Sequence, residues 1–396
     1  MPGPAPVRQP TARSEETIPR MDIDEQVSLA PLTTLGIGGP ARYLVRCRQI
    51  EQIFGALEWA ATESIPVHVL GGGSNTLFSD AGLDGLVLRI ELAGVDTDMS
   101  QAKAELRVAA GQDWDGLVQT TIASGMVGLE CLSGIPGYVG ATPIQNVGAY
   151  GQEVSDVLVQ VEAIDRTTLK TVVFDNEACE FAYRDSRFKG RDRDRYIVTR
   201  VTYRLERDTR PTIRYPELAQ QLQVAGVELD RLDGGRAAAA VRDVVLGLRR
   251  SKAMVVDPSD PNTRSAGSFF LNPILTSAQY EQTVMRWRSH TGDPASEIPS
   301  YPSSDSHSES GHKLPAAWLV EQAGFVRGTQ HSGAAVSDRH ALALVSRSGK
   351  EQDLLALAHQ IQRTVEDVFG VRLQREPVRV AREGTVLPSD DNEPRS

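Results

Sequence analysis

The 396-residue chain contains only three cysteines, Cys47, Cys131 and Cys179, and no pair of them has C-x-x-C spacing. This scarcity argues against a disulfide framework and against a cysteine-rich zinc site, and it favours reduced, structural thiols in a cytoplasmic protein. No apolar run approaches the roughly 20 residues that a membrane-spanning helix needs. We therefore expect a soluble protein without a membrane partner.

Positive charge is also scarce, with 42 Lys and Arg against 52 Asp and Glu and a formal net charge of -10 at pH 7. Without a sustained basic patch, nucleic acid is not expected as the main partner, and any anionic ligand must be held by local groups. The length predicts two or three domains. The composition of residues 1–21 and 381–396 predicts a disordered tail at each end, and the first lacks the apolar core of a secretory signal.

Glycine, by contrast, is concentrated in one apolar stretch, residues 127–151. Its glycines are Gly128, Gly134, Gly137, Gly140, Gly148 and Gly151. Glycine costs backbone entropy on ordering, so such a run indicates positive φ angles or a close approach of the backbone to a ligand. A buried cofactor is one interpretation, and a series of tight turns through a β-rich core is the other.

A second glycine-rich segment, Gly-Gly-Gly-Ser-Asn at 71–75, follows an expected strand at 67–70. Three successive glycines expose backbone N–H groups, and Ser74 and Asn75 add side-chain donors, which suits a pyrophosphate. No helix begins directly after the segment, so it is not the fingerprint of a Rossmann fold. A simple loop is the alternative.

Hydrophobic periodicity predicts an α+β protein. Helices are expected at 49–63, 115–124, 235–252, 314–322 and 352–369. Strands are expected at 77–78, 85–90, 105–110, 195–205, 341–345 and 371–380, with a hairpin formed by 157–165 and 170–174.

Two polar segments leave their roles open. Arg249, Arg250 and Lys252 end the helix at 235–252, where they either complement the helix dipole or form a phosphate seat. Residues 290–312 are dense in Ser, Pro, Asp, Glu and His and predict a long polar loop. Although this loop contains His307 and His312, it has no cysteine partner, so we expect no metal site.

Six motifs then appear in one order along the chain. They are Gly-Gly-Gly-Ser-Asn at 71–75, Ile-Pro-Gly-x-Val-Gly at 135–140, Pro-Ile-Gln-Asn-Val-Gly-Ala-Tyr-Gly at 143–151, Tyr-Arg-Asp-Ser at 183–186, Ala-Gly-Ser-Phe-Phe at 266–270, and Glu376 in the expected last strand. Together they resemble the UDP-N-acetylenolpyruvoylglucosamine reductase family, also called UDP-N-acetylmuramate dehydrogenase. Tyr215, in Ile213–Leu218, is similar to the signature of its type I members.

This resemblance implies a vanillyl-alcohol-oxidase-type FAD-binding domain in two α+β parts, at 22–91 and 92–235. A C-terminal α+β substrate domain would follow at 236–380. It also implies a cytoplasmic enzyme of peptidoglycan synthesis, and so of cell wall biogenesis, cell shape and cell division. We expect a monomer whose small-molecule substrates are NADPH and UDP-N-acetylglucosamine enolpyruvate.

In the implied reaction, hydride passes from NADPH to FAD and then to the enolpyruvyl ether, giving UDP-N-acetylmuramate. By match to the motifs, Arg184 and Glu376 would lie at the substrate carboxylate, and Ser268 would protonate the neighbouring carbon. The structural alternatives are a surface ion pair of Arg184 with Asp185 and a Glu376 that sits at a solvated strand end.

The match also assigns binding residues. Those expected at FAD are Gly71, Gly72, Gly73, Ser74, Asn75, Pro136, Gly140, Ala141, Thr142, Ile144 and Gly148. Those expected at the UDP-sugar are Tyr150, Tyr215, Lys252, Asn272 and His340. Two positions depart from the family pattern: Arg375 replaces a proline before Glu376, and Ala141 replaces a second serine that several relatives carry. Two other functions compete, another flavin oxidase of the same fold and a non-catalytic flavin or nucleotide-binding module.

Overall fold

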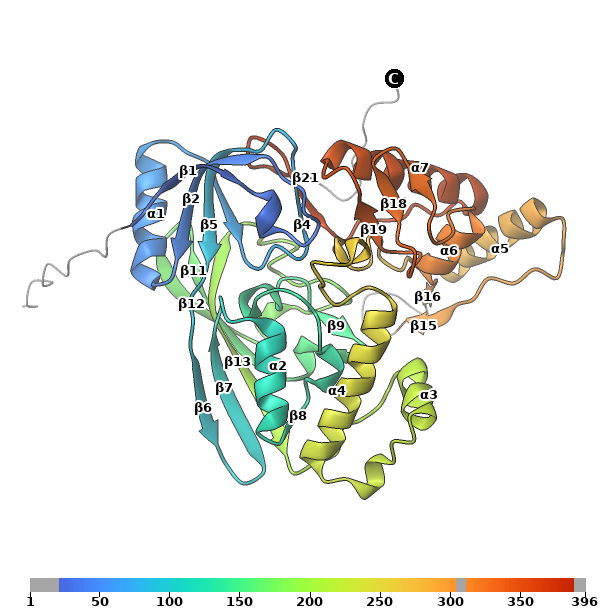
Figure 1. Ribbon diagram of the computed structural model, residues 1–396, viewed down its shortest axis with the longest axis horizontal. Coiled ribbons are helices and arrows are strands. Elements are labelled where there is room, and N and C mark those ends of the chain that lie inside the picture. Colours follow the sequence, from blue (N-terminus) through green and yellow to red (C-terminus); the bar gives the residue numbers. More distant parts are fainter. Residues whose placement is uncertain (1–20, 304–310, 388–396) are drawn as a thin grey trace, which may run out of the picture.

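The computed structural model describes residues 21–303 and 311–387 and contains three parts that follow one another along the chain (Figure 1). The first part has a sheet of order β1-β2-β5-β3, in which β2, β5 and β3 are parallel and β1 is antiparallel to β2. These strands are β1 (Asp24–Ser28), β2 (Pro40–Cys47), β3 (Val67–Leu70) and β5 (Leu83–Ile90). Helix α1 (Ile50–Thr62) packs on β2 and β5, which confirms the helix expected at 49–63.

The second part is an antiparallel sheet of order β12-β11-β13-β7-β6, with β8 paired to the end of β13. Its strands are β6 (Val95–Met99), β7 (Lys103–Ala109), β8 (Met126–Val127), β11 (Leu158–Asp165), β12 (Lys170–Asp175) and β13 (Tyr196–Arg207). The expected hairpin and the strand at 195–205 are thereby confirmed. Helix α2 (Trp114–Ala123) packs on the sheet, with the Trp114 and Tyr203 rings 5.9 Å apart. One continuous core joins these two parts.

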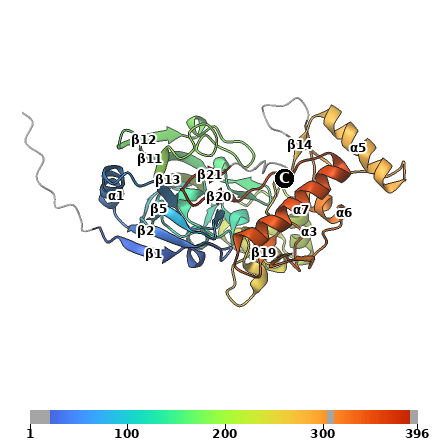
Figure 2. The same cartoon turned by 90° about the horizontal axis from the view of Figure 1, so that it is seen from above.

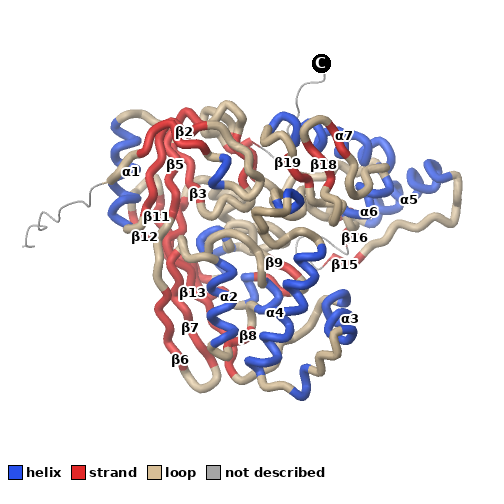
Figure 3. The backbone as a smooth tube through the Cα atoms, in the orientation of Figure 1, coloured by secondary structure: helices blue, strands red, loops and turns tan. Residues whose placement is uncertain are grey.

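Helix α4 (Gly234–Ser251) lies beside α2 and packs against β8 as well (Figure 3). A domain boundary at residue 235 would therefore place α4 in a different domain from α2 and β8, the elements on which it packs. The shorter helix α3 (Pro216–Val224) contacts α4, and β9 (Gly148–Ala149) pairs with β10 (Gln152–Glu153) inside the central glycine run. Short 3-10 helices occupy Ala30–Leu32, Glu130–Leu132, Val139–Ala141, Val154–Asp156, Glu177–Cys179, Leu229–Arg231 and Pro261–Thr263.

The third part is built around a second apolar core, to which three helices at one end of the molecule contribute together with Leu35, Ile37 and Leu77 of the first part (Figure 2). The helices are α5 (Ser277–Thr291), α6 (Ala316–Gln322) and α7 (Glu351–Phe369). Two small sheets of orders β14-β16-β15 and β17-β18-β19 accompany them. Their strands are β14 (Ile274–Leu275), β15 (Tyr301–Ser303), β16 (Gly311–Lys313), β17 (Gln330–His331), β18 (Ala334–Val336) and β19 (Leu344–Ser346).

The chain finally returns to the first part, where β20 (Val378–Val380) lies between β4 (Thr76–Phe78) and β21 (Val386–Leu387). Pairing of β20 with β4 is parallel and begins at Val378. The expectation of a strand over 371–380 is thus wrong for 371–377, and Glu376 lies before the strand. The tail predicted from residue 381 is also wrong for 381–387, because β21 pairs there with β20. Residues 1–20 and 388–396 lie outside the described residues.

The polar loop expected at 290–312 is wrong in part, since it contains the end of α5 together with β15 and β16. Thr276 caps α5 in a capping box with Gln279, and Gly292 ends the helix at a φ of 70°. His312 stacks on Tyr280 with ring centroids 4.2 Å apart, whereas His307 is not among the described residues.

The strand expected at 341–345 begins only at Leu344, because residues 340–343 form a turn. In that turn, the Ala343 N–H donates to the His340 carbonyl at 3.1 Å. Across 21–303 and 311–387, no helix has the length and apolar character to cross a bilayer. The three cysteines are free and buried, and burial raises the pKa of Cys47 to about 12.

Candidate active site

A cavity of about 960 Å³ lies at the junction of the three parts. Its lining includes every residue that the sequence analysis assigned to FAD, to the UDP-sugar or to catalysis. They come from the glycine loop after β3, the central glycine run, the turn at 183–186, the end of α4 and the segments at 265–272 and 374–378. Residues that are distant in sequence therefore share one site.

Two glycine-rich segments pack against each other along one side of this cavity. A Cβ atom on Gly72 would lie 2.6 Å from the Cα atom of Gly137, so the two backbones touch in a way that only glycine permits. Gly137 has a φ of 128°, and Gly73 has a φ of 68°. This close packing leaves a smooth backbone surface, as binding a flat or anionic cofactor requires. The positive φ angles and the close backbone approach that the glycine run predicted are both present.

Two of the predicted cofactor residues use their side chains to brace the protein. The Asn75 amide donates to Gln145 Oε1 at 2.7 Å and to the Glu376 carbonyl at 3.2 Å. The buried Thr142 hydroxyl donates to the Val139 carbonyl at 2.8 Å and bonds the Tyr203 hydroxyl at 2.7 Å. Contacts of these two residues with a cofactor are therefore expected mainly from the backbone.

Arg184 and Glu376 form an ion pair in the lining of the cavity, with Nε 3.5 Å from Oε1. The two side chains are 19% and 15% exposed, which excludes a surface pair of Arg184 with Asp185 and a solvated Glu376. Arg184 has a φ of 54° and donates to the Gly148 carbonyl. These contacts aim its guanidinium into the site.

The Glu376 carboxyl group lies in a largely dry environment. Burial raises its pKa, while Arg184 and Lys189 oppose that shift without cancelling it. The Gln145 amide donates to Oε1 at 3.4 Å. A carboxyl group in this setting holds a proton at higher pH than a solvated glutamate does.

The segment that carries Ser268 pairs through its backbone with the distant segment that carries Glu376. The Glu376 N–H donates to the Phe269 carbonyl at 2.9 Å, and the Leu271 N–H donates to the Gln374 carbonyl at 3.0 Å. Arg375, the departure from the family proline, is buried and forms a β-bridge with Phe270. The backbone on both sides of Glu376 is thus held in place despite that replacement.

Four of the five predicted UDP-sugar residues gather around the end of α4. The Tyr150 and Tyr215 rings meet edge to face at 5.6 Å, and Lys252 Nζ lies 5.8 Å from the centre of the Tyr150 ring. His340 Nδ1 accepts from the Leu342 N–H at 3.1 Å. Burial, followed by the charge of Lys252, lowers the pKa of His340 to about 4. The ring is therefore neutral at pH 7 and carries its proton on Nε2, which can act as a donor.

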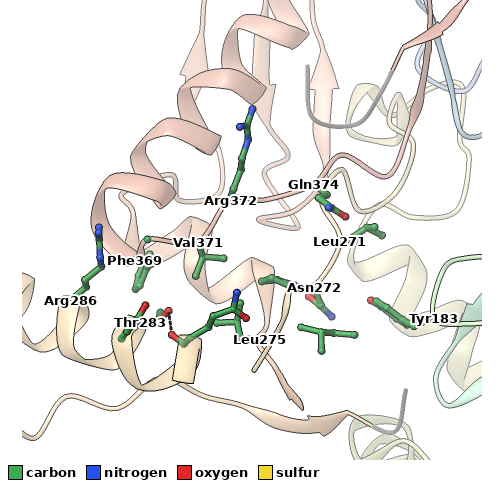
Figure 4. A pocket seen from close by; sticks show the side chains of 15 residues that line it. Tyr183, Leu271, Asn272, Leu275, Thr283, Arg286, Phe369, Val371, Arg372 and Gln374 are labelled. Atoms are coloured by element: carbon green, nitrogen blue, oxygen red, sulfur yellow. Dashed lines mark hydrogen bonds between the residues drawn. The ribbon is translucent and has the colours of Figure 1, made fainter. Parts of the chain in front are cut away.

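Asn272, the fifth of these residues, accepts from the Ala316 N–H at 2.9 Å and also lines a second cavity of about 570 Å³ (Figure 4). The two cavities share Tyr183, Leu271, Asn272 and Gln374. Arg286 and Phe369 lie at the far end of the second cavity (Figure 4). Asn272 therefore stands on the wall that separates the two spaces.

Several lining residues were not assigned from the sequence. Gln145 lies inside a quoted motif but carried no role, and Lys189 gave no signal beyond its position after the Tyr-Arg-Asp-Ser motif. Lys313, in β16, places Nζ 3.2 Å from the centre of the Tyr183 ring. Only tertiary structure identifies it as part of the site.

The basic cluster at the end of α4 divides between the cavity and solvent. Arg249 and Lys252 line the cavity, whereas Arg250 is exposed. Arg249 is 8% exposed and donates to the Met254 carbonyl at 2.8 Å, while its buried Nε atom has no partner among the described residues. In the described part of the chain, no group of three or more His, Cys, Asp or Glu side chains is arranged to bind a metal.

Comparison with known proteins agrees with this architecture. The family model described as the C-terminal domain of UDP-N-acetylenolpyruvoylglucosamine reductase matches residues 258–380, and an FAD binding domain matches residues 41–169. Proteins named UDP-N-acetylenolpyruvoylglucosamine reductase are similar over nearly the whole chain. The one from Thermobifida fusca is 44% identical over 89% of this chain and 97% of its own. The one from Streptomyces avermitilis is 45% identical over 89% of this chain and 93% of its own.

The fold is likewise similar to a solved reductase of that name from Thermus caldophilus. The TM-score is 0.60 at 24% identity, over 91% of this chain and 98% of that one. The α+β prediction of an FAD-binding domain followed by a C-terminal domain is confirmed. The identity to its curated relatives, maintained over most of both chains, shows that this chain belongs to the UDP-N-acetylenolpyruvoylglucosamine reductase family.

Proposed function

We propose that this protein is a cytoplasmic, FAD-dependent oxidoreductase that uses NADPH to reduce UDP-N-acetylglucosamine enolpyruvate to UDP-N-acetylmuramate, a peptidoglycan precursor. The names of its relatives and its FAD binding domain support this reaction. The single observation that carries the proposal is the largely buried Arg184–Glu376 pair, inside one large cavity that Ser268 also lines. We also propose that the protein is a monomer.

The residues of the cavity fit FAD. The contact of Gly72 with Gly137 leaves backbone surface without side chains, and Gly71 and Gly140 line the same wall. Buried Arg249 adds a cation to the cavity lining. When bound, FAD would accept hydride from NADPH and donate it to the substrate.

The chain's own groups would handle charge and protons. Hydride adds to the methylene carbon of the enolpyruvyl group, and the electron pair of the double bond moves toward the adjacent carboxylate. Arg184 neutralises the charge that develops there, and Glu376, whose pKa is raised by burial, would donate a hydrogen bond to the same oxygens when it carries a proton. The Ser268 hydroxyl then gives its proton to the neighbouring carbon and recovers one from solvent. One C–H bond forms at each of the two carbons as the double bond is lost.

Substrate orientation would come from the other end of the cavity. Lys252 would supply the counter-charge for the diphosphate, and neutral His340 would donate from Nε2. Tyr150 and Tyr215 would pack on the nucleotide, and burial raises the pKa of Tyr150 to about 12, which keeps its hydroxyl a donor. Asn272 would add an amide near the wall of the second cavity.

Anaerobic spectroscopy tests the reaction. NADPH should bleach the flavin of the purified holoenzyme, and UDP-N-acetylglucosamine enolpyruvate should then restore the oxidised spectrum. Recovery only after air is admitted would favour an oxidase of the same fold. A protein that cannot be loaded with FAD would refute both.

The role of Ser268 is tested separately. Ser268→Ala should leave flavin reduction by NADPH intact and slow transfer to the enolpyruvyl substrate by roughly 10²- to 10⁴-fold, the usual contribution of a general acid. Ser289→Ala, on the exposed face of α5, is the matched control and should behave as the unmodified enzyme. Normal turnover of Ser268→Ala would eliminate Ser268 as the proton donor.

A further inference from the structure

An acidic residue occupies the place where the proposed site should bind an anion. Both carboxylate oxygens of Glu217 lie 2.8 Å from Lys252 Nζ. Glu217 is in the first turn of α3, two residues after Tyr215, and Lys252 caps the C-terminal end of α4. The ion pair therefore ties the segment that carries Tyr215 to the residue expected to meet the diphosphate.

This segment is also held by contacts that do not involve Lys252. Leu218 and Leu222 of α3 pack against Val241 and Val245 of α4 in a small separate core. On the other side, Arg214 Nη1 lies 3.3 Å from Asp156 Oδ2. The Glu217 pair is thus not needed to attach α3 to the protein, and another role for it is open.

The charges of Glu217, Lys252 and a diphosphate indicate what that role is. A carboxylate that keeps both oxygens on Lys252 neutralises the ammonium group, and beside a bound diphosphate it would repel the ligand. The Lys252 and Glu217 side chains are 25% and 38% exposed, so water can hydrate Glu217 once it leaves. A diphosphate can replace the carboxylate on Lys252, whereas a neutral ligand offers nothing in exchange.

We propose that Glu217 is a specificity-determining residue that occupies the diphosphate seat at Lys252 and is displaced only by ligands that bring a diphosphate. This inference rests on the proposed function, because it takes Lys252 as the diphosphate partner. In this proposal the diphosphate replaces Glu217 as the ion-pair partner of Lys252. The free energy gained by binding the diphosphate at Lys252 is therefore reduced by the free energy lost when the Glu217–Lys252 pair breaks.

The test compares UDP with uridine on the FAD-loaded enzyme by isothermal titration. Glu217→Gln should bind UDP about fivefold more tightly, which corresponds to about 1 kcal/mol, and should bind uridine as the unmodified enzyme does. In steady state, KM for the UDP-sugar should fall while kcat is unchanged, because the diphosphate is remote from the reacting carbons. Weaker UDP binding would show that Glu217 orients Lys252, and equal tightening of uridine would show a general loosening of the segment. Either result overturns the proposal.

Two further variants separate the mechanism from its surroundings. Asp156→Asn removes the same charge and releases the same segment at Arg214, but it has no contact with Lys252, so UDP affinity should not change. In a Lys252→Gln background, Glu217→Gln should have no further effect on UDP. If the unmodified enzyme binds neither UDP nor the UDP-sugar, the proposed function fails as well. If it binds both and Glu217→Gln changes nothing, only the role of Glu217 is refuted.

Discussion

The contact between Gly72 and Gly137 offers a direct test of how the cofactor wall is built. In Gly72→Ala, the new methyl group would lie 2.6 Å from Gly137 Cα, 2.9 Å from its carbonyl carbon and 3.0 Å from Tyr138 N. Carbon atoms in favourable contact are about 3.5–4.0 Å apart, so one segment must move by roughly 1 Å. All three atoms belong to the backbone, and none can rotate away as a side chain could.

The expected cost follows from the packing. Adding a methyl group to a closely packed site typically costs about 1–3 kcal/mol. If FAD requires the original positions of both segments, a cost of about 2 kcal/mol weakens FAD binding by roughly 30-fold. Whatever part of this strain the cofactor-free protein does not relieve by moving the segments should instead lower its Tm, by about 2–4 °C per kcal/mol.

The assay is a titration of FAD into stripped protein, together with thermal unfolding. Gly247→Ala is the control, because its methyl group has nothing within 4 Å on the exposed face of α4. That variant should keep FAD affinity and gain about 0.5–1 kcal/mol, the usual helix preference of Ala over Gly. Unmodified FAD affinity and Tm in Gly72→Ala would refute the claim that these two glycines set the shape of the wall.

Three further predictions concern other parts of the molecule. Gln145→Leu removes a donor to the Glu376 carboxylate, so the pKa of Glu376 should rise further, and a pH–rate profile should show its basic limb displaced upward. Burial, followed by the charge of Arg166, lowers the pKa of His68 to about 4, below its unfolded value; stability is therefore present above pH 6.5 and lost as pH falls toward 4, by about 3 kcal/mol at most. His68→Leu should flatten that part of the Tm–pH curve, and an unchanged slope would contradict the assignment of this pH dependence to His68. Asp115→Ala removes a bidentate partner of Arg242 at 2.6 and 2.8 Å, and urea unfolding should show a loss of about 2 kcal/mol; a loss below a few tenths would mean that the pair is dispensable.

The local pattern of apolar residues predicted helices and strands well where a single period, helical or alternating, dominates the segment. The stripe in residues 352–369 predicted α7, found at Glu351–Phe369, because an amphipathic helix depends on neighbours three and four positions apart. The hairpin of β11 and β12 was predicted for a similar reason, since its turn and its alternation are both local. Helix α5 was missed although Thr276 and Gln279 form its capping box, because its apolar stripe is weak and polar residues dominate it.

The glycine segments show the limit of local pattern. Their composition indicated close backbone approach, yet the sequence did not say that the partner of Gly72 is Gly137. Neither did it indicate that Asn75 reaches Gln145 and the Glu376 carbonyl, a contact across 301 positions of the chain. The motif match supplied the list of site residues, whereas the fold supplied their distances.

Sequence by itself determined the α+β character, the family and the chemical types of the groups in the cavity, because these depend on local periodicity and on residues in motifs. Tertiary structure alone decided the positions, the burial and the charge partners of those groups. Glu376 lies before the last strand rather than in it, since residues 374 and 376 pair with residues 271 and 269. Burial raises its pKa against the opposing charge of Arg184, and Lys252 meets Glu217 because α3 packs on α4. Burial and charge pairing arise from contacts between distant segments, and no local pattern in the chain encodes them.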